Sequence, residues 1–175
     1  MNDGPAYGLT RRPVSATAIA LCASAGSAAA NPFDAFAAHC FSPFLTADRA
    51  AEVLPARHDF YDLNPFSDAA PSPASTPVTP GTDRRCEVTL DGDHGDAAAG
   101  TVVEALAAEG ITRDTALPAT HEDAALPGTT LLAARFLNPA RIAVVHTGTR
   151  PGPNGTETFL NVERLTPEAS AEAAR

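Results

Sequence analysis

Two cysteines, Cys40 and Cys86, constrain the fold more than any other feature of the sequence, because each lies in a different apolar pattern. Cys40 belongs to a set of residues that recurs at the spacing of one helix face. That set is Phe33, Phe36, Ala37, Cys40 and Phe44. The residues from Cys86 to Leu90 alternate instead between apolar and polar, which is typical of a half-buried strand. A helix laid on a sheet would therefore bring the two sulfurs into one layer.

The third cysteine, Cys22, is expected to be removed with an export signal, and in an exported chain the remaining two most simply form one disulfide. A bridge between Cys40 and Cys86 would enclose about 46 residues and stabilise the fold by about 3–4 kcal/mol through loop entropy. The alternative is a redox-active pair or a catalytic thiol. The wide spacing argues against it, because it lacks the C-x-x-C arrangement that lowers a thiol pKa. The pattern thus predicts a structural bridge.

The first thirty residues predict export. Arg11 and Arg12 are followed by the uncharged, mostly apolar run 14–25, and Ala28 and Ala30 fit the small-x-small pattern of a cleavage site. The run is shorter than the roughly 20 residues of a membrane span. We expect a signal peptide over residues 1–30, cleavage near Ala30-Asn31 and a periplasmic or secreted protein without a membrane span. A buried Ala-rich helix of a cytosolic domain is the alternative, and the choice between general and twin-arginine export stays open.

The mature chain is expected to be one α+β domain over residues 31–165. The sequence indicates a helix over 97–109, with Ala99, Val102, Val103 and Leu106 as its buried stripe and Gly110 at its end. Three apolar runs joined by turn residues follow it and predict an antiparallel meander. These runs are 130–137, 141–147 and 157–164. With the Cys86 strand they form an antiparallel sheet of about four strands in β-α-β-β-β order, packed with one main helix and a disulfide-tied N-terminal helical segment.

The remaining segments carry weaker patterns. A short helix is expected over 46–54, and residues 58–66 are expected to form an extended segment that covers the core. Residues 67–83 are rich in Pro, Ser and Thr without an apolar period, which predicts a loop tethered inside the bridge. Residues 166–175 are expected to form a flexible tail.

The charge balance excludes some partners. The chain has 21 acidic and 12 basic residues, a net charge of −9, and no basic run. Binding to nucleic acid or to an anionic membrane surface needs concentrated positive charge. We therefore expect neither partner, and no sequence pattern indicates a cofactor.

Candidate site residues fall in three places. Asp91, Asp93 and His94 lie in an acidic loop that could hold a hard cation, although the loop lacks the EF-hand pattern and a strand-to-helix turn explains the same residues. His121 lies in a polar cluster and Arg150 in a Gly-rich segment that could bind an anion. Both are weak candidates for binding, because a solvated loop and a hairpin explain them as well. The chain has no G-x-S-x-G, S-x-x-K, G-x-G-x-x-G or P-loop motif.

Two hypotheses about function follow. The first is an exported, non-enzymatic module that binds a protein or a small ligand in the cell envelope. The second is a metal-assisted hydrolase that uses Asp91, Asp93 and His94 with His121 or His146. The hydrolase requires these side chains to converge in space.

Overall fold

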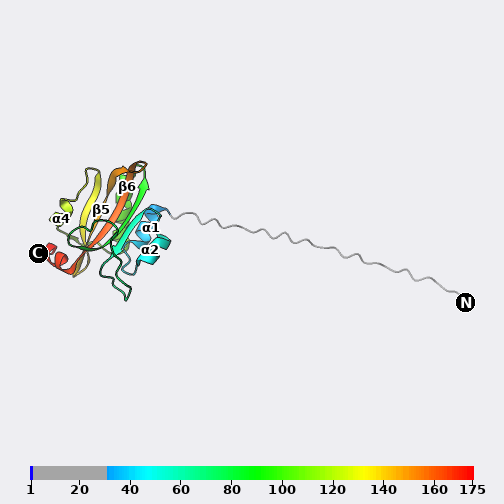
Figure 1. Ribbon diagram of the computed structural model, residues 1–175, viewed down its shortest axis with the longest axis horizontal. Coiled ribbons are helices and arrows are strands. Elements are labelled where there is room, and N and C mark those ends of the chain that lie inside the picture. The colour runs from blue at the N-terminus through cyan, green and yellow to red at the C-terminus, as the bar shows by residue number, and fades with distance from the viewer. Residues whose placement is uncertain (2–30) are drawn as a thin grey trace.

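The computed structural model describes Met1 and residues 31–175. Residues 2–30, which include Cys22 and all of the predicted signal peptide except Met1, lie outside the described part. The described chain is α+β, as expected, with one antiparallel sheet in the strand order β1-β2-β6-β5-β4-β3. Figure 1 shows the sheet with helices packed against it. The strands are β1 His58–Asp62, β2 Thr82–Asp91, β3 Asp114–Thr115, β4 Thr129–Asn138, β5 Arg141–Gly152 and β6 Gly155–Leu165.

The expected number of about four strands is wrong, because residues 31–175 form six. The two additional strands, β1 and β3, are the edges of the sheet. β1 lies in the segment that was expected only to cover the core, and it pairs along β2 from His58 to Asp62. β3 has two residues. Strands this short show too little alternation to be recognised from sequence.

The helices are α1 Pro32–His39, α2 Ala47–Val53, α3 Gly95–Ala108, α4 Ala119–Glu122 and α5 Pro167–Ala173. Their ends follow local sequence signals. Asn31 Oδ1 accepts a hydrogen bond of 3.2 Å from Phe33 N at the start of α1, and Thr46 Oγ1 accepts one of 3.3 Å from Arg49 N at the start of α2. Gly110 follows α3 with φ of +70°, a conformation that glycine adopts without strain.

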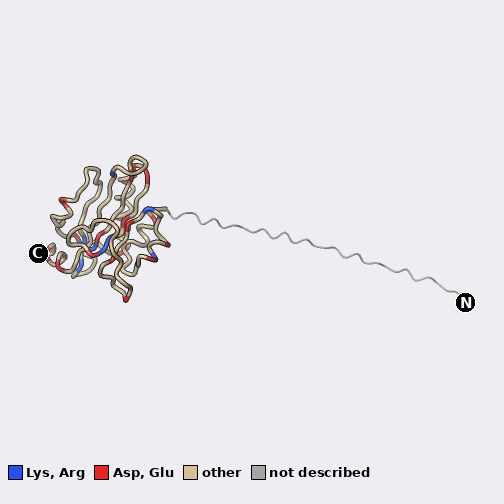
Figure 2. The backbone as a smooth tube through the Cα atoms, in the orientation of Figure 1, with Lys and Arg blue, Asp and Glu red and all other residues tan. Residues whose placement is uncertain are grey.

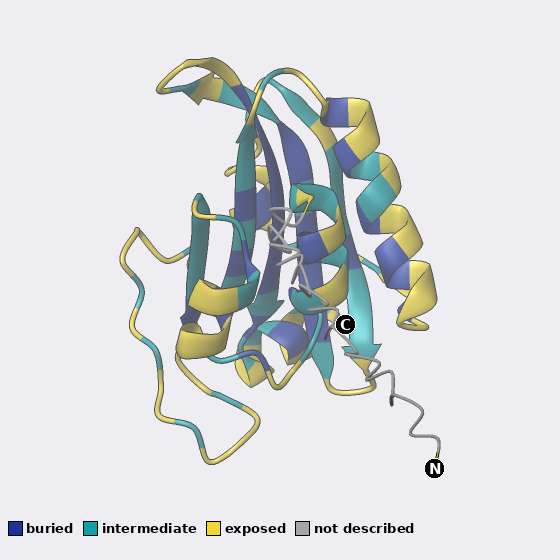
Figure 3. Ribbon diagram, turned by 90° about the vertical axis from the view of Figure 1, so that its right-hand side faces the viewer, coloured by how far each residue is buried: buried dark blue, intermediate teal, exposed yellow. Residues whose placement is uncertain are grey.

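The buried face of α3 differs from the expected stripe. Val103 is 54% exposed, whereas Ala98, Val102, Ala105 and Leu106 are buried. Figure 3 shows buried and exposed residues alternating along this helix. Apolar side chains flank the predicted stripe of α3 on both sides, so the helical period alone does not fix which residues lie at the middle of the buried face.

Phe44 is likewise not part of the core that its spacing predicted. α1 ends at His39, and Phe44 lies beyond it with 64% of its surface exposed. Its ring packs edge-on against Phe66 with centroids 5.5 Å apart. A helical spacing has meaning only as long as the helix continues.

In place of the expected flexible tail, residues 167–173 form α5. Thr166 Oγ1 accepts a hydrogen bond of 3.2 Å from Ala169 N, and Pro167 occupies the first turn. Ser170 is 1% exposed and its hydroxyl accepts a hydrogen bond of 3.2 Å from Ile142 N on β5. The Thr-Pro-Glu signal at 166–168 was therefore a helix start, and packing on β5 holds the short helix in place.

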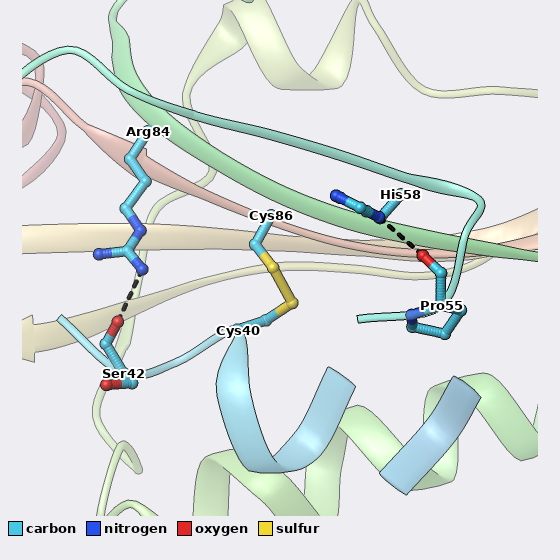
Figure 4. The surroundings of a disulfide bond; sticks show 6 residues. All are labelled: Cys40, Ser42, Pro55, His58, Arg84 and Cys86. Carbon is cyan, nitrogen blue, oxygen red and sulfur yellow. Dashed lines mark hydrogen bonds between the residues drawn. A yellow bond between two sulfur atoms is a disulfide. The ribbon is translucent and has the colours of Figure 1, made fainter. Parts of the chain in front are cut away.

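The main core lies between the sheet and helices α1, α2 and α3. Each central strand presents alternate apolar residues to this side, including Val88, Val145 and Leu160. The predicted Cys40–Cys86 disulfide is present in this layer, with Cα atoms 5.4 Å apart, and Figure 4 shows it joining the end of α1 to β2. The bridge therefore ties the N-terminal helix to β2, the strand next to the edge strand β1.

A network of ion pairs lies at one end of the sheet. Asp62 contacts Arg84 at 3.3 Å and Arg164 at 2.8 Å, and Asp83 contacts Arg164 at 2.7 Å and Arg141 at 2.6 Å. The Asp62 and Arg84 side chains are only 4% and 6% exposed. Because the residues come from β1, β2, β5 and β6, the network joins four strands.

None of the helices among the described residues is long and apolar enough to cross a membrane.

Candidate functional site

The sheet face opposite the main core carries polar side chains in register. One row crosses four strands, from Asp59 on β1 to Glu87 on β2, Asn161 on β6 and His146 on β5. A neighbouring row pairs Arg85 with Glu163. Figure 2 shows acidic and basic positions interspersed over the part of the fold that contains the sheet. Directly opposite side chains lie about 4.5–5.5 Å apart at Cβ, so these groups interact across the strands.

This face forms the floor of a cavity of about 580 Å³. One wall is the segment that contains α4 and Leu126, and another is the Pro-rich segment, through Thr76 and Thr79. Figure 3 shows the Pro-rich segment as a long, mostly exposed loop beside the sheet. The size is within the range of small-molecule sites, which measure about 300–1,000 Å³.

Arg85 connects the floor to the Pro-rich wall. Its guanidinium donates hydrogen bonds to Thr76 Oγ1 at 2.9 Å, to the Pro77 carbonyl at 3.1 Å and to Thr79 Oγ1 at 3.0 Å. It also contacts the carboxylates of Asp59 at 3.2 Å and Glu163 at 2.6 Å. One largely covered side chain thus holds the loop against the sheet.

Glu163 is a carboxylate kept ionised in a buried position. Its side chain is 5% exposed and accepts hydrogen bonds from Arg85 Nε and Thr79 Oγ1, both at 2.8 Å. Burial opposes ionisation, but the interactions with His121, Arg85 and Thr79 outweigh it and hold the pKa of Glu163 below its ordinary value.

A second ion-pair cluster closes the other end of the floor. Arg150 donates hydrogen bonds of 2.7 Å to Glu87 and to Glu157, and Arg57 pairs with Glu157 and with Asp91. Burial raises the pKa of Glu87 despite the opposing charge of Arg150. Glu87 is therefore less fully compensated than Glu163.

Two buried polar groups of the cavity lack hydrogen-bond partners among the described residues. Asn161 is 7% exposed, and its Oδ1 has no partner. His121 is 3% exposed, and its Nε2 lies 3.2 Å from Glu163 Oε2 but is not aligned for a hydrogen bond. We treat this pair as an electrostatic contact, because a hydrogen bond depends on angle as well as distance. Such groups cost about 1–3 kcal/mol each when no partner reaches them.

His146 completes the floor next to Asn161. Its Nε2 lies 2.7 Å from Thr129 Oγ1, and its ring packs edge-on against Phe159 with centroids 4.8 Å apart. Burial is the main reason that the pKa of His146 falls to about 4, and the nearby charge of Glu163 offsets this only in part. The imidazole is therefore neutral at physiological pH.

His146 should make the fold sensitive to mild acid. Its pKa is lower in the folded state than the ordinary value of 6.5, so between pH 6.5 and about 4 the unfolded chain binds a proton that the folded chain does not. Stability therefore falls as the pH decreases through this window. We expect H146Q to reduce the slope of the unfolding free energy against pH in this window by about 1 kcal/mol per pH unit. The unfolding free energy at each pH is measured by urea unfolding.

H94Q, which removes an exposed histidine outside the cavity, is the matched control for the loss of a histidine. An NMR titration of the His146 ring gives an independent reading. A midpoint near 6.5 would contradict the burial argument.

The acidic loop does not join this cavity. Asp93 and His94 line a separate shallow pocket with Asp96 and Thr130. Asp91 lies nearer to the cavity, and its hydrogen bonds with Asn154 and Arg57 lower its pKa. Within residues 31–175, no group of three or more His, Cys, Asp or Glu side chains is placed to hold a metal ion. The structure therefore does not bring Asp91, Asp93 and His94 together with His121 and His146.

The two weak binding candidates do lie in the cavity, since His121 and Arg150 both line it. Sequence reasoning missed Glu87, Asn161 and Glu163. Their signal is the polar half of the strand alternation, which is typical of a side that faces solvent. A strand pattern does not show whether other segments fold over its polar face.

The chain matches no protein-family model, and comparison with curated proteins and with solved structures found no significant similarity.

Proposed function

We propose that this protein is an exported, non-enzymatic binding module that holds a small ligand in the cavity on the polar face of the sheet. The observation that carries the proposal is Asn161, which lines a cavity of about 580 Å³ and whose Oδ1 is buried without a hydrogen-bond partner in residues 31–175. A ligand that hydrogen-bonds this amide would remove the cost of leaving it unpaired.

The ion pairs around Asn161 support a preformed site. Arg85 and Arg150 are each held by two carboxylates, so the floor keeps its shape without a ligand. A site that is already ordered loses less conformational entropy when it binds. This favours a small ligand over a protein partner, because the polar groups converge in a concave site.

The disulfide is compatible with the proposed location in the periplasm or outside the cell. The metal-assisted hydrolase receives less support, because its candidate residues are divided between two pockets. Binding alone requires only the arrangement of acceptors and donors that the cavity contains.

The proposal predicts ligands whose binding depends on Asn161. A library of small polar compounds would be screened by thermal shift, and the compounds that bind would be located by amide NMR shifts at Glu87 and Asn161. N161L keeps the side-chain size but removes the amide. We expect it to raise the Kd of the compounds that bind at least tenfold, measured by calorimetric titration.

E104Q on the exposed face of α3 is the matched control and should bind like the unchanged protein. Hits that shift other parts of the fold, or that bind N161L equally well, would contradict a binding site in this cavity.

A further inference from the structure

We infer that the ligand is a small organic cation whose ammonium or guanidinium group binds between Glu87, Asn161 and Glu163. This inference rests on the proposed function, because it assigns a chemical class to the ligand of the same cavity.

The charge of the cavity favours a cation. Its lining residues include four carboxylates, from Asp59, Glu87, Glu157 and Glu163, and three guanidinium groups, from Arg57, Arg85 and Arg150. Among these groups, the carboxylates exceed the guanidinium groups by one negative charge. A cationic ligand would neutralise it in a partly enclosed setting where water screens charge less than in bulk.

Each of the three guanidinium groups already contacts two carboxylates. Arg85 contacts Asp59 and Glu163, Arg150 contacts Glu87 and Glu157, and Arg57 contacts Glu157 and Asp91. An anionic ligand would bring a further negative charge close to these carboxylates. Like charges at short range repel each other, which is unfavourable.

Acceptor oxygens, by contrast, remain available. Among the described residues, Arg150 bonds Glu87 through Oε1 at 2.7 Å, which leaves Oε2 for a ligand. Glu163 Oε2 meets only the poorly aligned His121, and the Asn161 amide can present its oxygen by rotating about its terminal torsion. Burial raises the pKa of Glu87 despite the charge of Arg150, so a further cation beside this carboxylate would stabilise its ionised form.

These three acceptors lie close together on the sheet. Glu87 and Asn161 are directly paired across β2 and β6, and Glu163 is two residues along β6 on the same face. The spacing is about 5 Å across the strands and about 7 Å along one strand. An ammonium group has three donors and no acceptor, so it fits a set of acceptors that a neutral or anionic group would leave unpaired.

The test compares three four- or five-carbon probes that differ in charge: 1,4-diaminobutane, 1,4-butanediol and glutarate. Each is titrated into the full chain by calorimetry and by amide NMR. We expect saturable binding of the diamine alone, with shifts at Glu87, Asn161 and Glu163. E87Q should weaken this binding at least tenfold, while E104Q leaves it unchanged.

The outcomes separate this inference from the proposed function. Binding of glutarate or butanediol in the cavity without the diamine would overturn the cation and leave the binding module standing. Equal diamine affinity in E87Q, with its fold intact by NMR, would also overturn the cation site. Failure of every probe and of every library compound to shift cavity residues would overturn both.

Discussion

Replacing Cys40 and Cys86 together by alanine should lower the free energy of unfolding by about 3–4 kcal/mol. The bridge closes a loop with a sequence separation of 46 residues, and this loop contains α2, β1 and the Pro-rich segment. Without the bridge, the unfolded chain gains the conformations that the cross-link forbids. The folded state also loses packing, because both cysteines are buried beside Phe36.

The measurement is urea unfolding of two proteins that both carry C22S, so that no third thiol is present. One is otherwise unchanged and keeps the bridge, and the other is the double variant with alanine at positions 40 and 86. A chemical reductant should destabilise the unchanged protein by a similar amount and leave the double variant unaffected. Equal unfolding midpoints with and without the bridge would show that the cross-link does not support the fold.

The second large effect is expected from D62A, which should cost about 3–5 kcal/mol of folding free energy. Asp62 is the carboxylate that faces both Arg84 and Arg164, and Arg84 is 5% exposed. Burial already lowers the pKa of Arg84 to about 10, and Asp62 offsets part of that effect. Removing Asp62 leaves a positive charge in the protein interior with less compensation.

The exposed pair Arg49–Glu52, at 2.8 Å with side chains 59% and 65% exposed, provides the control. R49A should change stability by less than about 1 kcal/mol, because exposed ion pairs contribute little. The double variant D62N/R84M removes the buried charge of Arg84 together with its partner and should recover part of the loss. If D62A unfolds at the same urea concentration as R49A, the buried network does not stabilise the fold.

Local signals in the sequence anticipated most of the regular elements. The caps at Asn31 and Thr46, the alternation after Cys86 and the glycine after α3 depend on neighbouring residues, so a single stretch of sequence contains the information. The edge strands β1 and β3 were missed because their formation depends on a partner strand. The same limitation applies to α5, where contact with β5 stabilises a helix of seven residues.

The candidate site shows the same division. The polar cluster around His121 and the Gly-rich segment around Arg150 indicated two residues of the cavity, whereas nothing in the strand pattern distinguishes Glu87, Asn161 and Glu163 from solvent-facing residues. The sequence by itself determined the α+β class, the pairing of Cys40 with Cys86 and which residues of each strand share a face, because these follow from periods of two and 3.6 residues. Only the tertiary structure decided that the polar face of the sheet is enclosed. That outcome depends on where the Pro-rich loop and α4 come to lie, and such contacts join residues far apart in the chain.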